Sequence, residues 1–291
     1  TSRSTRTIVL PLPGGPQALI GVGGSCSSAL PFDSQVGWSC TTTLGSGGTS
    51  RVLGSHNAIG DATTGVVAAG STFEVDKDET VGNLSGIGGS GGVTQLNFRK
   101  QLTLGGDDSS ATYSGDLRGS GTLVKEGAGT FTLAGQSGPG FVGWVVIKEG
   151  TVEIDGVGQA RGISSKVNVR ASGTLLFNKP DSIGLLSGEG SLVLNADLSV
   201  GRAAHSNFLG AISGTGKFTK TGTGLLILGG PGTWTGGTEI NNGFISVDSV
   251  PSNLGSGGIR LDGGTLKTTA THSNSVERIE LGPNGGTIDV D

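Results

Sequence analysis

The chain is poor in the residues that build large globular cores. Aromatic residues make up 4% of its 291 residues, charged residues make up 14%, and methionine is absent. A large globular core is therefore not expected, because Phe, Tyr and Trp bury the most area per residue. The net charge of −4 also argues against a disordered polyelectrolyte. Since no Met marks a translation start, we expect the chain to be a processed or excised piece of a longer protein.

The sequence lacks the features of several other protein classes. Its 19 Lys and Arg residues are scattered and form no basic block, which argues against a nucleic-acid partner. No apolar run approaches the roughly 18 residues of a transmembrane helix, and the N-terminus has no signal-peptide pattern. The 58 Gly residues follow no period of three, which excludes collagen.

Short strands separated by glycine-rich turns make up most of the chain. Apolar and polar residues alternate with the strand period of two in several segments, for example 130–133, 151–154, 166–169, 192–194 and 258–261. No amphipathic helix longer than two turns is found, and each interior Gly would cost a helix about 1 kcal/mol. The pattern predicts an all-β fold.

Internal repeats indicate which all-β fold this is. Residues 102–135 align with residues 198–230 at an offset of 95 to 96, and this superperiod contains shorter units of roughly 20 residues. A unit holding two or three short strands cannot bury both of its faces unless it stacks on its neighbours, which favours a parallel β-solenoid. About ten rungs spaced by about 4.8 Å are expected from residue 66 onward. An up-and-down β-barrel or a β-sandwich is the alternative.

The alternation also predicts which side chains face inward. These residues are expected to form ladders of apolar side chains along the core: Leu123, Phe131, Leu133, Ile154, Val169, Leu175, Leu226, Leu228, Val247 and Leu266.

One repeated motif carries a family resemblance. It consists of the turn KTGTG at 220–224, a strand with Leu226 and Leu228, the segment WTGGT at 234–238, and the strand NGFISV at 242–247. An earlier copy keeps the turn as KEGAG at 125–129 but has FVGW at 141–144 in place of the TGGT stretch. The pattern resembles the passenger-associated repeat of bacterial autotransporters. The resemblance covers 113–156 and 208–268, is looser over 57–112 and 157–207, and is absent from 1–56.

The resemblance implies a fold and a location. It implies a right-handed, single-stranded parallel β-helix that is exported to the outer surface of a Gram-negative cell. It implies contact with a membrane only through a C-terminal barrel that these residues do not include. The repeat is a stacking unit, so it indicates architecture and secretion route and does not identify a ligand.

Residues 1–56 differ from the rest of the chain. We predict that they form an irregular N-terminal cap, and that residues 57–291 form the β-helix repeats. Cys26 and Cys40, which lie fourteen positions apart, are expected to form a disulfide in an oxidising compartment. A disulfide that closes such a short loop would stabilise the fold by about 3 kcal/mol. The alternative is a loop presented for recognition, and a zinc site is disfavoured because His56 is the one His nearby.

No catalytic constellation is found. The chain has no G-x-S-x-G motif. Gly48-Thr49-Ser50 resembles the serine motif of subtilases, but too few residues precede Ser50 to supply the Asp and His of a triad. His56, His205 and His272 show no paired spacing. We therefore predict no catalytic residue, no cofactor and no metal, and expect that the protein is not an enzyme.

Two small acidic clusters remain as candidate sites. Asp76, Asp78 and Glu79 form one, and Asp107 and Asp108 form the other. Carboxylates on the outer face of a β-helix can bind Ca²⁺ or act in acid–base chemistry. Both clusters lie at predicted turns, where Asp is common because it hydrogen-bonds to nearby backbone. The turn interpretation is favoured.

Two tryptophans are the other candidates. Trp144 and Trp234 lie in nearly corresponding units, where packing in the core or at a corner is favoured over a sugar-stacking platform.

The expected function is that of an extracellular adhesin or self-association rod. Rows of Thr, Ser, Asn and Asp on successive rungs would make many weak polar contacts. The partner would be a host-cell or extracellular-matrix macromolecule, or the same protein on a neighbouring cell. The alternatives are a structural stalk presenting another domain and a carbohydrate-active β-helix enzyme, which rests on fold analogy alone.

Overall fold

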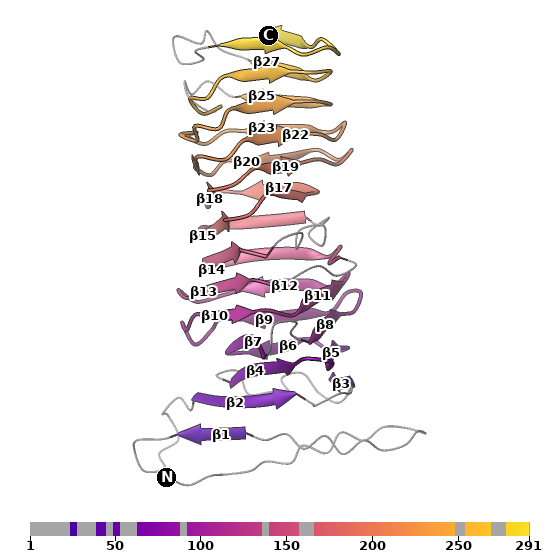
Figure 1. The fold of residues 1–291 in the computed structure, drawn as a ribbon, viewed down its shortest axis with the longest axis vertical. Coiled ribbons are helices and arrows are strands. Elements are labelled where there is room, and N and C mark those ends of the chain that lie inside the picture. Colours follow the sequence, from indigo (N-terminus) through magenta and orange to yellow (C-terminus); the bar gives the residue numbers. More distant parts are fainter. Residues whose placement is uncertain are drawn as a thin grey trace.

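The chain forms a rod of stacked parallel strands. The computed structural model describes residues 24–27, 39–44, 49–52, 63–87, 92–135, 140–156, 166–247, 254–268 and 278–290. These residues contain 29 strands and no helix, and all strand pairs except β1–β2 are parallel. None of them could cross a membrane as a helix. The predicted all-β parallel β-helix is confirmed (Figure 1).

The rod has three faces, which the chain visits in a fixed order. Strands β17 (Leu185–Gly188), β18 (Ser191–Leu194) and β19 (Leu198–Val200) lie on faces that we call 1, 2 and 3. Strands β20 (Ser206–Phe208), β21 (Ile212–Gly214) and β22 (Phe218–Lys220) then return to the same three faces one rung further on. Each of these six strands therefore pairs with strands one full turn away, as expected when every turn is one rung.

Face 1 is an unbroken path of eleven parallel strands. They are β6 (Glu79–Val81), β9 (Gln101–Leu104), β12 (Thr122–Lys125), β14 (Trp144–Ile154), β15 (Lys166–Phe177), β17 (Leu185–Gly188), β20 (Ser206–Phe208), β23 (Leu225–Leu228), β25 (Phe244–Val247), β27 (Thr265–Thr268) and β29 (Thr287–Val290). Strands β14 and β15 are long, and their second halves turn the corner onto face 2.

The other faces are built in the same way. Face 2 also contains β2 (Ser39–Leu44), β4 (Thr63–Ala68), β7 (Asn83–Ile87), β10 (Ala111–Tyr113), β13 (Thr130–Leu133), β18 (Ser191–Leu194) and β21 (Ile212–Gly214). Face 3 contains β3 (Thr49–Val52), β5 (Thr72–Val75), β8 (Val93–Leu96), β11 (Asp116–Gly119), β16 (Asp181–Ile183), β19 (Leu198–Val200), β22 (Phe218–Lys220), β24 (Thr238–Ile240), β26 (Ile259–Leu261) and β28 (Ile279–Leu281).

The strand register shows that one repeat unit makes one turn. Phe218 lies beside Leu198 in one neighbouring rung and beside Thr238 in the other, so equivalent positions recur here at a constant interval. Other turns are shorter, as between Thr174 and Ser191, or longer, as between Glu79 and Leu102. The short repeat unit predicted from the sequence is therefore one rung.

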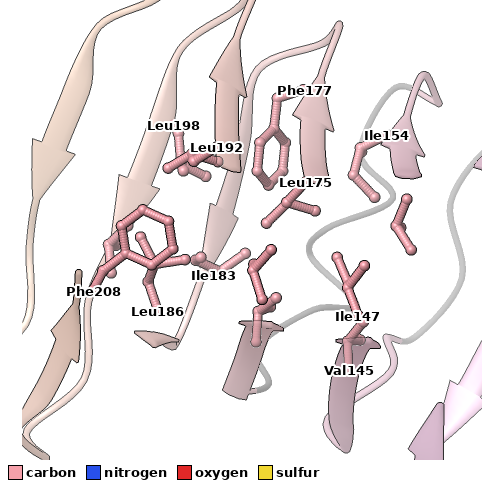
Figure 2. Packing of buried hydrophobic residues seen from close by; sticks show 14 of the residues in the cluster. Val145, Ile147, Ile154, Leu175, Phe177, Ile183, Leu186, Leu192, Leu198 and Phe208 are labelled. Carbon is pink, nitrogen blue, oxygen red and sulfur yellow. The ribbon is translucent and has the colours of Figure 1, made fainter. Parts of the chain in front are cut away.

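Apolar side chains fill the centre of the rod in continuous ladders. Leu175 lies between Val152 and Leu192 of the adjacent rungs, and all three are fully buried. Figure 2 shows Leu175 and Leu192 among other residues of this core. All ten positions predicted to face inward are buried, with Leu266 the most exposed at 5%. Full burial of one such aliphatic side chain contributes about 1.5–3 kcal/mol. The core therefore depends on many small contributions from successive rungs.

The N-terminal strands continue the stacking. Within the predicted cap of residues 1–56, β2 pairs in parallel with β4 and β3 pairs in parallel with β5. The additional strand β1 (Gly24–Ser27) runs antiparallel to β2 and places Cys26 directly opposite Cys40. The boundary between residues 56 and 57 and the disulfide both stay predictions.

Candidate functional site

The repeated lysine turn is a corner of the rod and contains a buried lysine. Lys125 is fully buried at the end of β12, and its Nζ donates to the carbonyl oxygens of Glu126 at 2.5 Å and Gly127 at 2.7 Å. It also reaches the carbonyl of Glu149, one rung further on, at 3.5 Å. Burial lowers the pKa of Lys125 below its ordinary value, and the charge of Asp108 opposes part of that effect.

Lys220 makes the corresponding contacts in the second copy of the turn. It is 2% exposed, and its Nζ donates to the carbonyl of Gly222 and, at 3.5 Å, to that of Asn242 in the next rung. Burial lowers the pKa of Lys220 to about 8. Both lysines therefore connect two successive corners through backbone carbonyls.

The second glycine of each turn is required by close stacking. A Cβ atom on Gly129 would lie 2.1 Å from the carbonyl oxygen of Ser109 in the preceding rung. A Cβ atom on Gly224 would lie 2.2 Å from the carbonyl oxygen of Ala204. Any side chain there would push two rungs apart, which explains why the motif contains glycine at this position.

The two copies of the motif occupy different corners. Strand β12 of the first copy lies on face 1 and leads to β13 on face 2, whereas β22 of the second copy lies on face 3 and leads to β23 on face 1. The repeat therefore forms a corner wherever it occurs. Its copies do not line up as one ligand-binding face.

The acidic residues at turns connect neighbouring rungs. Asp78 accepts a hydrogen bond from the backbone N–H of Gln101 at 3.0 Å, and Asp108 accepts one from the N–H of Ala128 at 2.7 Å. Asp107 accepts from the N–H of Ser109 within its own turn at 3.1 Å. These contacts support the turn interpretation of these residues.

The other two acidic candidates are also engaged. Asp76 accepts a hydrogen bond from the side chain of Asn97, and Glu79 is 1% exposed. Over the part of the chain that the structure describes, no group of three or more His, Cys, Asp or Glu is placed to hold a metal ion.

The two tryptophans differ in their surroundings. Trp234 is fully buried, packs against Phe218 with ring centroids 5.9 Å apart, and donates from Nε1 to the carbonyl of Gly237 at 3.1 Å. Trp144 is 43% exposed on face 1, and the Nζ of Lys166 lies 4.4 Å from its ring centroid. The favoured packing interpretation therefore describes Trp234, whereas Trp144 presents an aromatic surface already covered in part by a cation.

Two of the residues considered for catalysis lie among the described residues. Ser50 lies in β3 and His205 is exposed in the segment between β19 and β20. His56 and His272 lie outside the described residues.

The strongest candidate for a recognition site is a groove on face 3. Its volume is about 340 Å³, and it runs across β24, β26 and β28, with Lys217, which directly precedes β22, at one end. Its lining includes two glycine pairs of adjacent rungs, Gly236–Gly237 and Gly257–Gly258. Lys217 and Arg278 occupy the rungs on either side of these glycines, so the groove is a gap in a row of outward side chains.

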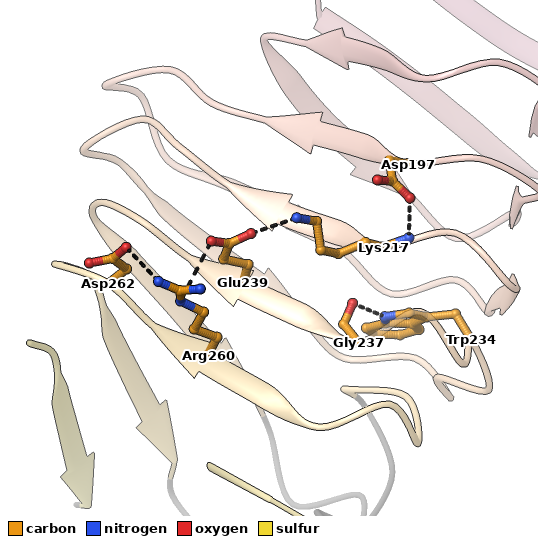
Figure 3. Close-up of polar contacts among 7 residues, drawn as sticks. All are labelled: Asp197, Lys217, Trp234, Gly237, Glu239, Arg260 and Asp262. Atoms are coloured by element: carbon orange, nitrogen blue, oxygen red, sulfur yellow. Dashed lines mark hydrogen bonds and ion pairs between the residues drawn. The ribbon is translucent and has the colours of Figure 1, made fainter. Parts of the chain in front are cut away.

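Charged side chains of alternating sign border the groove. Glu239, Arg260 and Glu280 occupy equivalent places in three successive rungs. Glu239 binds Lys217 Nζ at 2.7 Å through Oε2 and lies 3.9 Å from Arg260 Nε through Oε1 (Figure 3). Because Glu239 is contacted from the rungs on both sides, its carboxylate is held in a defined position.

The network continues beyond the groove. Arg260 pairs with Asp262 at 3.3 Å, and Asp262 also accepts from the backbone N–H of Asn284 at 2.9 Å. Arg278 pairs with Glu280 at the outer end. Asp197 accepts from the N–H of Lys217 at 2.9 Å at the other end (Figure 3). Such exposed ion pairs contribute about 0–1 kcal/mol each, so the network adds little to stability.

Sequence reasoning did not find this groove. Its charged residues come from successive rungs that are distant in sequence, and the rungs vary in length, so their alignment is visible only in the folded chain. The paired glycines were recognisable as turn composition, but their position on two adjacent rungs was not.

Comparison with known proteins agrees with this architecture. A family model described as the passenger-associated-transport-repeat matches residues 123–154 and 218–247, the two segments that contain Lys125 and Lys220. The adhesin BmaC autotransporter of Brucella suis biovar 1 (strain 1330) is 28% identical over 236 residues. This alignment covers 75% of the chain and 6% of the relative, so the chain corresponds to a small part of that protein. No solved structure matches significantly.

These matches confirm the predicted resemblance. The chain resembles the passenger-associated β-helix repeat region of bacterial autotransporters and has the exported, cell-surface location of such a region.

Proposed function

We propose that this part of the passenger acts in adhesion and not in catalysis. The observation that carries the proposal is the groove on face 3, where ordered polar side chains from four rungs face outward around a gap in the row of side chains. The relative named as an adhesin supports the same role. No nucleophile adjacent to a base is found among the described residues that line the groove.

The rod would bind through many modest contacts. Its core is continuous, and polar side chains of successive rungs face outward on face 3, so these binding groups are held at fixed spacing. Rigid spacing allows several weak contacts to act together, because each further contact forms within the same complex. The partner would be a host-cell or extracellular-matrix macromolecule, or another copy of the protein on a neighbouring cell.

Adhesion and self-association are separated by two measurements. Beads carrying the chain should adhere to cultured cells or to cell-free extracellular matrix, and beads carrying the Glu239→Gln, Arg260→Gln variant should adhere less. Sedimentation velocity over a range of protein concentrations should show a rising sedimentation coefficient if rods bind one another. A chain that is monomeric at all concentrations and adheres to neither surface would contradict the proposal and favour a structural stalk.

A further inference from the structure

We propose that the groove on face 3 binds uncharged saccharide, about one or two sugar units at a time. The inference rests on the proposed adhesive function and names the ligand class of that site. It follows from the shape of the groove, from the signs of its charges and from the ion pairs that hold its side chains in place.

The shape of the groove limits the size of the ligand. A volume of about 340 Å³ lies at the lower end of the range for small-molecule pockets, which suits a mono- or disaccharide. Lys217 and Arg278 are three rungs apart, so roughly 14 Å of rod separates the two ends of the gap. A longer glycan would leave the groove at either end and continue along the surface.

The glycines at the bottom of the groove have no side chains and therefore leave its backbone accessible. Outward positions of the two central rungs are occupied by Gly237 and Gly258. Both have positive φ angles, of 83° and 68°. Any other residue would therefore be strained there and would also fill the gap. A ligand can thus approach the backbone directly between the flanking charged side chains.

The signs of the charges select against ions. The groove is lined by three cations, Lys217, Arg260 and Arg278. Each is paired with a carboxylate, that of Glu239, Asp262 and Glu280 respectively, so the positive and negative charges balance. A sulfate, phosphate or polyanionic glycan near the cations would be repelled by the carboxylates, and a cation would be repelled by the Lys and Arg side chains. A ligand without net charge avoids both penalties.

The chemistry of hydroxyl groups matches this arrangement. Each sugar hydroxyl donates one hydrogen bond and accepts others, as Ser and Thr hydroxyls do. The carboxylates of Glu239 and Glu280 can only accept, and the Lys217, Arg260 and Arg278 side chains can only donate. One hydroxyl of a sugar ring could therefore donate to a carboxylate of the groove while its neighbour accepts from an adjacent Lys or Arg side chain. Hydrogen bonds to charged groups are about twice as strong as those between neutral groups.

The ion pairs keep these groups ordered before a ligand arrives. The carboxylate of Glu239 is contacted by Lys217 and Arg260, and its side chain is 17% exposed. Binding therefore costs little side-chain entropy at this residue. The groove offers no exposed aromatic ring for stacking, since Trp234 beside it is buried, so the affinity of one site is expected in the millimolar range.

The test is a titration followed by amide NMR of the folded chain. The uncharged probes are lactose, maltose, cellobiose and N,N′-diacetylchitobiose, and the anionic probes are digalacturonate and a heparin disaccharide. We expect at least one uncharged probe to shift the amide signals of Gly237, Thr238 and Gly258 with saturation, and the anionic probes to bind more weakly. The variant Glu239→Gln should weaken that binding about five-fold or more.

Two further variants keep the result interpretable. Arg278→Gln alters an exposed rim residue, 74% exposed, without risk to the fold and should also weaken binding. Glu126→Gln is the matched control, because Glu126 pairs with Lys148 at 2.5 Å away from the groove and its loss should leave binding unchanged.

The proposal is overturned if none of the four uncharged probes shifts the groove amides up to tens of millimolar. It is also overturned if an anionic probe binds more tightly or if Glu239→Gln has no effect. The NMR result concerns the groove alone, so adhesion of beads without saccharide shifts would reject this ligand while leaving the adhesive function in place.

Discussion

Lys125 and Lys220 lie in different copies of the repeat and on different faces of the rod, yet each connects its own turn to the turn one rung further on. The partners in the further rung, Glu149 and Asn242, immediately precede Gly150 and Gly243, whose φ angles of 68° and 66° are nearly equal. The same two-rung corner is thus built twice, in different orientations about the rod axis. This supports the interpretation of the repeat as a structural unit of the β-helix.

Removing the ammonium group of Lys220 should weaken the rod. Lys220→Met keeps an unbranched apolar chain in place of the lysine stem but leaves the carbonyls of Gly222 and Asn242 without this donor. We expect the free energy of unfolding in urea to fall by about 1–3 kcal/mol, with faster amide hydrogen exchange in the turn at 220–224. Lys217→Met is the control, since Lys217 is half-exposed and its loss should cost about 1 kcal/mol or less. Equal effects of the two substitutions would contradict the corner role.

Lys220 should also make stability depend on pH. Its pKa is about 8 in the folded chain and about 10.5 when unfolded, so between these values the unfolded state holds a proton that the folded state has lost. The free energy of unfolding should therefore rise with pH in this window, by about 1–2 kcal/mol between pH 8 and pH 10. Urea midpoints of the wild type and Lys220→Met at several pH values isolate the effect. A rise of the same size in the variant would assign it to other groups.

The fold could be predicted from the sequence because its causes are local. Alternation places Leu123 inward, repeated glycine-rich turns mark the length of each rung, and all ten predicted core positions are buried. The same alternation also places Lys125 inward, two residues after Leu123, so its burial could have been inferred. A lysine is expected at the surface, and one of the carbonyls that Lys125 contacts, that of Glu149, comes from a rung that the sequence does not identify.

The groove could not be predicted for a different reason. It depends on which residues of different rungs lie side by side, and the rungs differ in length along the chain. A shift of one residue in register would move Glu239 from the outer face to the core. Without the register, Lys217, Glu239 and Arg260 are three scattered charges.

The single tyrosine of the chain provides a probe of the core. Tyr113 is fully buried, accepts from the hydroxyl of Thr94 at 2.8 Å and donates to the carbonyl of Gly92 at 2.9 Å. Burial raises its pKa above the ordinary value of 10.0. Above about pH 10 the unfolded state alone loses this proton, so stability should fall as pH rises further.

This behaviour can be measured by absorbance. No tyrosinate absorbance should develop in the folded chain near pH 10, and it should appear together with the loss of the β-sheet circular dichroism signal at higher pH. Urea-unfolded chain is the control and should titrate near the ordinary pKa. Tyrosinate formation in chain that keeps its circular dichroism would show that Tyr113 is accessible and would contradict its burial.

Replacing Tyr113 by Phe tests its hydrogen bonds separately. The substitution keeps the ring but removes the partner of the Thr94 hydroxyl and the donor to Gly92. We expect a loss of about 1–2 kcal/mol in the free energy of unfolding, which the double substitution with Thr94→Val should partly restore. Full additivity of the two substitutions would indicate that the hydroxyl groups do not interact.

Cys26 and Cys40 should form a disulfide that joins β1 to β2. They are directly opposite one another in an antiparallel pair, where Cα atoms are about 4.5 or 5.5 Å apart, and both values fall within the range of disulfides. We expect no thiol to react with maleimide in urea before reduction, and two to react afterwards. Peptide mapping without reductant should recover Cys26 and Cys40 in one linked product.

The Cys26→Ser, Cys40→Ser variant should be cleaved faster by protease near β1, because the bond restricts the unfolded segment. Two reactive thiols in chain secreted through an oxidising compartment would contradict the pairing, and unchanged proteolysis of the variant would show that the bond does not secure β1.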